Sequence, residues 1–471
     1  MITRSKFLCV VVLLFAAIAS VAKGNEDWPR FRGVNGSGVS TSRGLPVEFG
    51  AAKNLLWKVA APKGTSSPII AGGQLYFSSY EGKQRTLHCL DPATGKTRWT
   101  RSVTKVREEN ATPPNNPATP TPVSNGELVF VLYPDAGLFC YSADGQEKWK
   151  VALQPFHSMH GMASSLMTVD DLVIVVADQL ADSYMAAFKA DTGKPVWKSD
   201  RLDGVTGGYS TPSVYKSPGG SLGLVVSGPL EVAAYDPATG KRLWWIDGVT
   251  NAPISVPVVW HDRAFVCEAL GEPIPFSLMA SLDKNKDGKI SLDEVKSNVP
   301  MTRLVERIDK GWGDHKGVIG PAEWDKAWGT MLNKGGLVAL QIGGSGDVTK
   351  TNIRWSYGKG MPSISSPVIY DDLVYVVRDG GILSTFEAST GKLVKQARLQ
   401  SHSRQYYASP IAADGLIFVL DTEGGLTVVK AGRDWTALAT NELGESCWAT
   451  PAISDGRLYV RSDKSIFCFG K

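Results

Sequence analysis

Apolar and polar positions alternate along this chain in short runs, and one phrase closes many of the runs. The phrase is an aspartate, a Thr-Gly turn and a strand ending in tryptophan, as in residues 91–99, Asp-Pro-Ala-Thr-Gly-Lys-Thr-Arg-Trp. Further copies, some weaker, lie at residues 142–149, 191–197, 236–244 and 388–394. A phrase repeated at about 45–50 residues is typical of a repeat array. Each copy predicts a hairpin, because glycine permits the positive φ of the turn. The pattern therefore predicts an all-β array.

A second repeat marks the start of each unit. Small hydroxyl residues, usually with proline, precede a short apolar strand at Ser66-Ser67-Pro68, Thr121-Pro122, Ser164-Ser165-Leu166, Ser210-Thr211-Pro212, Ser255-Val256-Pro257, Ser365-Ser366-Pro367, Ala408-Ser409-Pro410 and Ala449-Thr450-Pro451. Small residues suit the crowded inner rim of a radial array. Units of four short strands around a channel are typical of β-propellers, which leave few open edges. The eight starts predict an eight-bladed β-propeller.

The two ends of the chain predict how the ring closes. The last unit ends at residue 471 after three strands and has no tryptophan strand of its own. Residues 54–59, which include Trp57, would supply the missing outer strand. Pairing them with the final unit leaves no open sheet edge. We therefore expect residues near both termini to share one sheet.

The first 22 residues resemble a secretory signal peptide. Arg4 and Lys6 precede an apolar run that ends at a small-residue cleavage site, Ser20-Val21-Ala22. The run is too short for a confident membrane span. Removal of the two cations lowers the formal charge from +4 to +2, which argues against nucleic acid as the main partner. We expect a periplasmic or secreted protein whose signal peptide is cleaved.

Cysteine spacing excludes several kinds of site. Cleavage would remove Cys9 and leave five cysteines, an odd number, at positions 89, 140, 267, 447 and 468. No Cys-x-x-Cys occurs, so neither a haem attachment site nor a zinc ribbon is supported. We expect buried free thiols in the core.

The β pattern stops inside the fifth unit and resumes at Gly336. The expected organisation is a signal peptide at 1–22, propeller at 23–270 and 336–471, and an insertion at 271–335. Residues 283–294 of the insertion match the calcium-loop pattern D-x-[DN]-x-[DN]-G-x₅-E at every specified position. The expected ligands are the side chains of Asp283, Asn285 and Asp287, the Lys289 carbonyl, Ser291 through a water, and both oxygens of Glu294. Apolar periodicity on both flanks predicts the two helices of an EF-hand.

A second loop follows between Asp309 and Glu323. Aligning Glu323 with Glu294 places Trp312 at the first ligand position and Lys316 at the third acidic one. Neither supplies a carboxylate, so we interpret this loop as a degenerate partner that pairs structurally. Alternatively, Asp309 and Asp314 supply the missing carboxylates to a distorted metal site. The sequence leaves open whether this loop binds metal.

The repeated phrase resembles the tryptophan-docking repeat of the PQQ-like propeller superfamily. That superfamily includes the quinoprotein dehydrogenases and the propeller lipoprotein of the outer-membrane assembly machinery. The opening residues 27–38 are similar to secreted bacterial PQQ-like repeat proteins. The resemblance implies that tryptophans dock between adjacent blades, namely Trp57, Trp99, Trp149, Trp197, Trp244 and Trp355. Blade six departs from the repeat with Val394, and blade seven has no clear match.

The resemblance does not by itself imply the quinone cofactor. Quinoprotein dehydrogenases typically show adjacent cysteines, an acidic residue and an asparagine that hold a metal under the quinone, and a catalytic aspartate. This chain has no adjacent cysteines and is short for that class. Fold alone does not decide function, so PQQ is possible but not favoured.

Residues just ahead of the Ser/Thr-Pro starts should ring one mouth of the channel. They are Lys63, His157, His160, Tyr209, Met361, Arg404, Tyr406, Tyr407, Cys447 and Trp448. Arg404, Tyr406, Tyr407 and Trp448 form the candidate binding patch, because cations and aromatic rings suit a planar anion, a sugar or a peptide. Aromatic packing between blades is the competing interpretation. His157 and His160 would need a third ligand to hold a metal, so we favour a structural role for them.

No catalytic constellation stands out, so an enzyme is the less favoured interpretation. The leading hypothesis is an exported scaffold or binding protein with one calcium ion and an unidentified protein or carbohydrate partner. The alternative is an oxidoreductase that uses PQQ or another planar cofactor at the channel mouth. A third possibility makes the calcium loop a sensor, although extracellular calcium would keep even a weak site filled.

Overall fold

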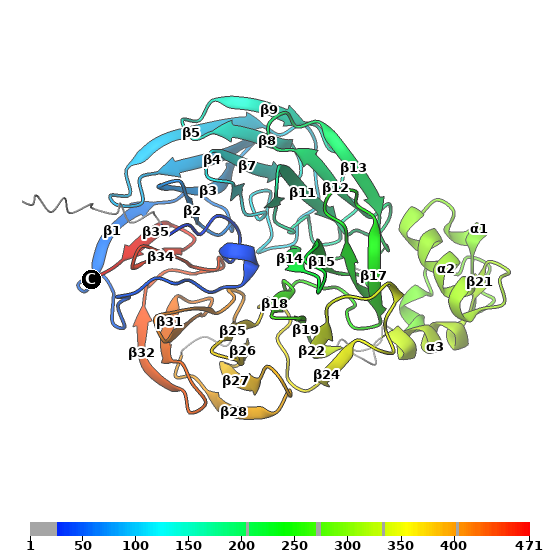
Figure 1. Ribbon diagram of the computed structural model, residues 1–471. Helices are drawn as coiled ribbons and strands as arrows, with labels where there is room; N and C mark the ends of the chain where they lie inside the picture. The colour runs from blue at the N-terminus through cyan, green and yellow to red at the C-terminus, as the bar shows by residue number, and fades with distance from the viewer. Residues whose placement is uncertain (1–25, 204–206, 270–274, 332–334, 402–404) are drawn as a thin grey trace, which may run out of the picture.

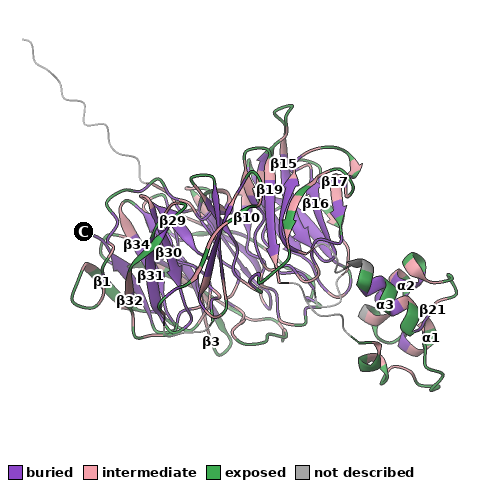
Figure 2. Ribbon diagram, turned by 90° about the horizontal axis from the view of Figure 1, so that it is seen from below, coloured by how far each residue is buried: buried purple, intermediate pink, exposed green. Residues whose placement is uncertain are grey.

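The computed structural model describes residues 26–203, 207–269, 275–331, 335–401 and 405–471. Within these residues, eight sheets of four or five strands surround a central axis (Figure 1). Seen from the side, the sheets form one thick disc with helices projecting from its rim (Figure 2). The predicted all-β, eight-bladed propeller is thus confirmed. The predicted signal peptide at 1–22, the expected boundary at 270–271 and Arg404 all lie outside the described residues.

Each blade is a meander numbered from the axis outward. Blade one contains β2 (Ile69–Ala71), β3 (Gln74–Glu81), β4 (Gln84–Leu90) and β5 (Thr97–Thr104). Blade two contains β6 (Val123–Ser124), β7 (Leu128–Tyr133), β8 (Gly137–Ser142) and β9 (Glu147–Val151). Blade three contains β10 (Met167–Val169), β11 (Leu172–Ala177), β12 (Tyr184–Lys189) and β13 (Pro195–Asp200). Blade four contains β14 (Ser213–Lys216), β15 (Leu222–Gly228), β16 (Glu231–Tyr235), β17 (Arg242–Asp247) and β23 (Gly346–Asp347).

The remaining blades follow the same order. Blade five contains β18 (Val258–Trp260), β19 (Arg263–Glu268), β22 (Gly336–Gln341) and β24 (Ile353–Tyr357). Blade six contains β25 (Val368–Tyr370), β26 (Leu373–Arg378), β27 (Ile382–Glu387) and β28 (Leu393–Arg398). Blade seven contains β29 (Ile411–Ala413), β30 (Leu416–Leu420), β31 (Gly425–Lys430) and β32 (Thr436–Glu442). Blade eight contains β33 (Ala452–Ser454), β34 (Arg457–Arg461), β35 (Ser465–Phe469) and β1 (Leu55–Ala60).

Blade eight draws its strands from both ends of the chain. Strand β1 pairs antiparallel with β35, and Trp57 lies opposite Cys468. The segment near the N-terminus therefore supplies the outer strand of the final sheet. This pairing completes the four strands of blade eight.

The repeated phrase works by docking one blade on the next. The indole N–H of Trp99 donates to the carbonyl of Ala143 in the following blade at 2.8 Å, and Trp149 bonds Ala190 in the same way at 2.9 Å. The glycine of each phrase packs against the same indole. At Gly193, with φ of 69°, a Cβ would lie 2.6 Å from the ring of Trp149. Glycine is thus required both for its positive φ and for the close approach.

Trp244 departs from the predicted docking. Its indole is buried and donates at 3.0 Å to the hydroxyl of Tyr215, in its own blade. The segment after β22 lacks the Thr-Gly phrase, so the following blade offers no turn of this kind to accept the bond. Instead β23 pairs parallel with β17 and covers the outer edge of blade four.

The hydroxyl residues at the strand starts form a belt around the axis. At six of the starts, a backbone N–H donates to the side-chain hydroxyl of the equivalent residue in the next blade. Six such bonds, of 2.9–3.0 Å, join Ser67 to Thr121, Thr121 to Ser165, Ser165 to Thr211, Val256 to Ser366, Ser366 to Ser409, and Ser409 to Thr450. The small residues therefore link the blades, in addition to fitting a crowded rim.

The segment before β1 crosses the axis, where it includes the short 3-10 helix η1 (Val34–Gly36) (Figure 1). Arg30 donates to the carbonyl of Pro212 in blade four at 2.7 Å. Arg32 donates to the carbonyl of Pro367 in blade six at 2.5 Å and to that of Pro410 in blade seven at 3.4 Å. Both guanidinium groups are buried, and burial lowers the pKa of Arg30 to about 10 and that of Arg32 to about 9. The chain thus fills part of its own channel.

The five described cysteines are buried and unpaired, as predicted. Cys89, Cys140 and Cys468 each lie opposite a docking tryptophan on the neighbouring strand. Burial raises the pKa of all three thiols to about 12. They are therefore small core residues and poor nucleophiles.

Candidate functional site

A helical insertion separates β19 from β22 of blade five. It consists of the 3-10 helix η2 (Phe276–Met279), β20 (Ile290–Ser291), α1 (Leu292–Val295), α2 (Val299–Trp312), β21 (Val318–Ile319) and α3 (Pro321–Met331). Strands β20 and β21 pair antiparallel, with Ile290 opposite Ile319. On the N-terminal flank of the loop, where a helix was predicted, the described residues form the 3-10 helix η2.

In the loop that precedes α1, the predicted oxygen donors accept hydrogen bonds from the backbone of the loop itself. The Asp283 carboxylate accepts the amides of Asp287 and Gly288, at 3.2 and 2.9 Å. The Asn285 side chain accepts the amide of Asp287 at 2.9 Å, and Asp287 accepts that of Lys289 at 2.8 Å. Gly288 has φ of 77° and makes the sharp turn. The loop is thus held in a tight coil by its own side-chain oxygens.

Glu294 closes the loop from α1. One carboxylate oxygen accepts the amides of Lys284 and Asn285 at 2.8 and 3.2 Å, and the other accepts the amide and hydroxyl of Ser291 at 2.8 Å each. These hydrogen bonds, first those from Ser291, lower the pKa of Glu294 to about 2. The carboxylate is therefore ionised at neutral pH and already bridges the two ends of the loop.

The donor set suits a hard cation. Three carboxylates, one amide oxygen and a backbone carbonyl are oxygen ligands of the kind that calcium takes. Within the described residues, however, no three His, Cys, Asp or Glu side chains are grouped closely enough to form a metal cluster. The carboxylates of Asp283 and Glu294 instead face backbone amides.

The second loop uses its acidic residues differently. Asp309 is buried, and its two carboxylate oxygens accept the amides of His315 and Gly317 at 3.0 and 2.7 Å. Asp314 forms an exposed ion pair with Lys316 at 2.8 Å. Glu323 accepts the amide of Gly320 at 2.9 Å, much as Glu294 accepts that of Ser291. The carboxylate of Asp309 thus occupies the inside of this loop by itself.

One propeller residue enters the hydrophobic core of the insertion. The core includes Ile290, Ile308, Trp324 and Trp328, and Leu230 from the β15–β16 turn packs into it. Leu230 has φ of 64°, which is uncommon for a bulky side chain. A second contact joins the guanidinium of Arg307 on α2 to the carbonyl of Asp203 at 3.0 Å. The insertion is therefore docked on the propeller.

At the channel mouth, the candidate patch is only partly open. Tyr406 is buried and donates its amide to Asp379 at 3.0 Å. Tyr407 and Trp448 are partly exposed, with ring centroids 5.2 Å apart in an edge-to-face contact. Arg404 cannot be placed, because it lies outside the described residues. The structure therefore brings together one aromatic pair of the predicted patch.

The other mouth residues serve the frame of the propeller. Met361 and Cys447 are buried, and Lys63 accepts the amide of Tyr80 through its carbonyl. His160 shares a 3.1 Å hydrogen bond with the hydroxyl of Thr112, and its ring lies 6.1 Å from that of Tyr209. His157 is exposed, and its amide donates to Gln179.

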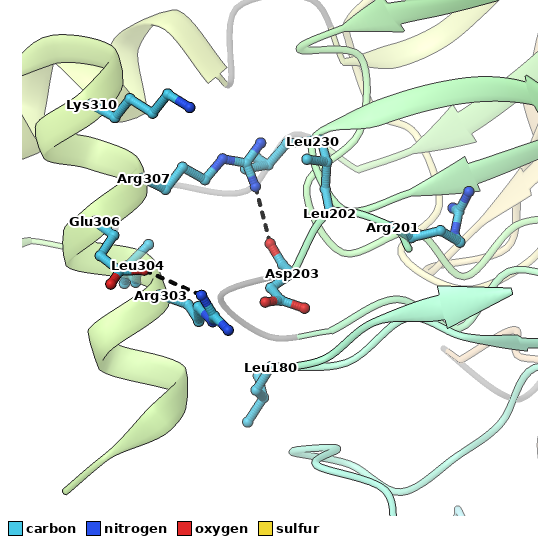
Figure 3. Close-up of a pocket in the computed structure, with 10 residues that line it drawn as sticks. All are labelled: Leu180, Arg201, Leu202, Asp203, Leu230, Arg303, Leu304, Glu306, Arg307 and Lys310. Atoms are coloured by element: carbon cyan, nitrogen blue, oxygen red, sulfur yellow. Dashed lines mark hydrogen bonds and ion pairs between the residues drawn. The ribbon is translucent and has the colours of Figure 1, made fainter. Parts of the chain in front are cut away.

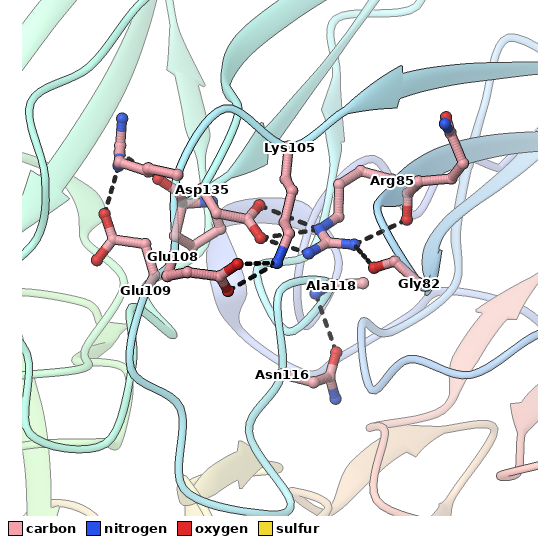
Figure 4. Close-up of polar contacts among 11 residues, drawn as sticks. Gly82, Arg85, Lys105, Glu108, Glu109, Asn116, Ala118 and Asp135 are labelled. Atoms are coloured by element: carbon pink, nitrogen blue, oxygen red, sulfur yellow. Dashed lines mark hydrogen bonds and ion pairs between the residues drawn. The ribbon is translucent and has the colours of Figure 1, made fainter.

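Ion pairs hold the mouth-side loops of blades one and two (Figure 4). Arg85 binds Asp135 through two guanidinium nitrogens at 2.5–3.1 Å, and both side chains are buried. Lys105 contacts Glu108 at 2.5 Å on the same loop. These contacts hold the loops of blades one and two in place.

A protein-family model described as outer membrane protein assembly factor BamB matches residues 47–179, 83–271 and 322–469. These matches cover both propeller segments.

The chain belongs to this family.

Solved structures share the fold. BamB from Moraxella catarrhalis is 12% identical, with a TM-score of 0.53 over 88% of this chain and 97% of that one. A europium-containing methanol dehydrogenase is 13% identical, with a TM-score of 0.53 over 92% and 89%. The quinohemoprotein alcohol dehydrogenase from Comamonas testosteroni is 13% identical, with a TM-score of 0.55 over 95% and 81%. Such low identities show the fold alone. No curated protein matches the chain significantly.

A cleft lies between α2 and the propeller (Figure 3). The sequence analysis did not predict this third region. Arg303, Arg307 and Lys310 extend into it from α2, and Leu230 lies on its propeller side. The spacing of the three cations was visible in the sequence. Their partner surface was not, because it belongs to blades three and four. None of the described helices is long and apolar enough to cross a membrane.

Proposed function

We propose that this protein is an exported, calcium-binding β-propeller that acts as a scaffold for a protein or carbohydrate partner. The observation that carries the proposal is the docked insertion. A helical unit stands where a blade would have a tight hairpin, and Leu230 of the propeller fills part of its core. A side-mounted unit of this kind offers a partner surface without disturbing the eight sheets.

The calcium site would lie in residues 283–294. Asp283, Asn285 and Asp287 would supply side-chain oxygens, Lys289 its carbonyl, Ser291 a water contact and Glu294 both carboxylate oxygens. The bound ion would supply positive charge that ties the loop to α1. The coil held by Asp283 and the inward carboxylate of Glu294 support this assignment. Because Asp309 already fills the second loop, we propose a single site.

Calcium removal tests the site directly. Saturating calcium at about 100 times its Kd stabilises a protein by roughly 2.7 kcal/mol, so the insertion should melt higher with calcium than with chelator. The melt is followed by tryptophan fluorescence, since Trp324 and Trp328 lie in the core of the insertion. Glu294→Gln should abolish the calcium-induced rise in Tm.

Glu323→Gln is the matched control, because Glu323 holds the equivalent place in the first turn of α3. It should keep the calcium-induced rise. Equal melting of the wild type with and without calcium would contradict the proposal. Loss of the rise in Glu323→Gln as well would mean that the second loop also takes part.

The scaffold is favoured over the oxidoreductase because the chain occupies its own axis. Arg30 and Arg32 bond carbonyls of blades four, six and seven, and Trp28 is buried beside blade one through its pairing with Ile70. Among the residues predicted to ring the channel mouth, Tyr406 and Cys447 are buried. A planar cofactor would have to fit above these groups. A visible absorption band in the purified protein would favour the oxidoreductase instead.

Export is part of the proposal. It rests on the charged and apolar segments of residues 1–22. The family description names an outer-membrane assembly factor, which supports a periplasmic or secreted location.

A further inference from the structure

A cleft of about 310 Å³ separates α2 from blades three and four (Figure 3). Its α2 wall carries three cations, Arg303, Arg307 and Lys310, at positions i, i+4 and i+7. Residues at this spacing lie on one face of a helix. Figure 3 shows the side chains of Arg307 and Lys310 extending from α2 toward the propeller. The cleft is therefore bordered by a row of positive charge.

The cations of the cleft outnumber its acidic residues, Asp203 and Glu306. Arg307 donates one N–H to the carbonyl of Asp203, and Arg303 approaches Glu306 only at 3.5 Å. Lys310 has no hydrogen-bond or ion-pair partner among the described residues. The Asp203 carboxylate accepts the amide of Ser183 at 2.8 Å. Burial lowers the pKa of Arg307, while the carboxylates of Glu231, Asp247 and Asp203 act in the opposite direction.

The floor of the cleft is apolar. Leu180 and Leu202 of the propeller and Leu304 of α2 line it, together with Leu230. Leu230, which has an uncommon positive φ, packs into the core of the insertion, so the floor is a formed junction. A ligand that suits the cleft carries negative charge and an apolar side chain together.

The cleft continues into a longer groove. A space of about 1030 Å³ shares Arg201, Asp203 and Arg303 with the cleft and runs along blade three, past Tyr184 and Trp197. Arg201 does not offer its positive charge to a ligand, because the Asp178 carboxylate already neutralises it. The combined length suits an extended chain better than a small anion.

We propose that the cleft between α2 and blades three and four binds an extended acidic peptide segment of a partner protein. Its carboxylates would lie on Arg303, Arg307 and Lys310, and an apolar side chain would contact the leucine floor. This inference rests on the proposed scaffold function and names the site and the class of its partner. Charge complementarity of this kind raises association rates and selects the partner.

The test uses the full mature protein with calcium and a fluorescent octapeptide that alternates glutamate and leucine. Fluorescence polarisation at physiological ionic strength measures its Kd, so that exposed charges are screened as in the cell. The variant R303E/R307E/K310E should bind roughly 30-fold more weakly, because three charge pairs become repulsive. The variant R303Q/K310Q, at two exposed positions, should bind more weakly by a smaller factor and keeps the test valid if the triple variant misfolds.

The matched control is K96E/K392E/K430E, which has the same net charge change at exposed lysines on other parts of the propeller. It should leave the Kd within about threefold of the wild type. Equal loss in both triple variants would overturn the proposal, as would absence of binding to the wild type. Complete competition by free glutamate at peptide concentrations would also overturn it in favour of a small-anion site. A quinone in the absorption spectrum would refute the scaffold function without altering the peptide result.

Discussion

Replacing Asp178 with alanine is expected to destabilise the propeller by about 3–5 kcal/mol, because it leaves a buried guanidinium without its carboxylate. Arg201 donates to Asp178 at 2.5 and 2.9 Å and to the hydroxyl of Tyr235 at 2.8 Å. The two charged side chains are 1% and 0% exposed. Burial alone would lower the pKa of Arg201, but Asp178 raises it instead. Removal of Asp178 therefore exposes the full cost of burying the cation.

Urea unfolding followed by circular dichroism measures this loss. Asp171→Ala is the control in the same blade, since Asp171 forms an exposed pair with Lys189. Exposed pairs contribute about 0–1 kcal/mol, so this variant should unfold near the wild-type midpoint. Similar midpoints for Asp178→Ala and Asp171→Ala would contradict the importance assigned to the buried pair.

Replacing Arg32 with methionine is expected to lower stability by about 2–3 kcal/mol through loss of hydrogen bonds at the axis. Arg32 bonds the carbonyls of Pro367 and Pro410 in addition to that of Gly36 in its own segment. Methionine has a similar length but cannot donate to these buried carbonyls. The loss of stability is limited because the substitution also removes a buried charge that is costly to desolvate. The same desolvation lowers the pKa of Arg32.

Arg43→Met is the control on the same N-terminal segment, because the Arg43 side chain is 85% exposed. Limited proteolysis should release the N-terminal segment faster in Arg32→Met and at the wild-type rate in Arg43→Met. An unchanged rate in Arg32→Met would mean that the axis contacts do not hold this segment in place.

The fold could be predicted from the repeat because the residues of each copy interact over short sequence distances and in the same way in each blade. The Thr-Gly turn and its tryptophan predict both the hairpin and the docking seen at Trp99 and Trp149. Eight Ser/Thr starts predicted eight blades, although their hydroxyls also bond between blades in a way that spacing alone does not reveal. Where the phrase is missing after β22, prediction failed, and Trp244 bonds within its own blade.

The sites were predictable only where a single stretch of sequence contains them. Residues 283–294 are contiguous, so their oxygen donors could be identified one by one. The axis contacts of Arg32 and the cleft beside Leu230 join segments far apart in the chain. Neither Arg32 nor Leu230 follows a pattern that marks such a contact. Of the predicted mouth patch, Tyr406 is buried between blades, whereas Tyr407 and Trp448 stay partly exposed.

Native mass spectrometry of protein purified from its own host tests most directly whether the protein is a calcium-loaded scaffold without an organic cofactor. No metal or cofactor is added at any step. The account predicts a mass excess of one calcium ion, which is absent in Glu294→Gln. An additional cofactor-sized mass that is lost on acid denaturation would contradict it and return attention to the channel mouth.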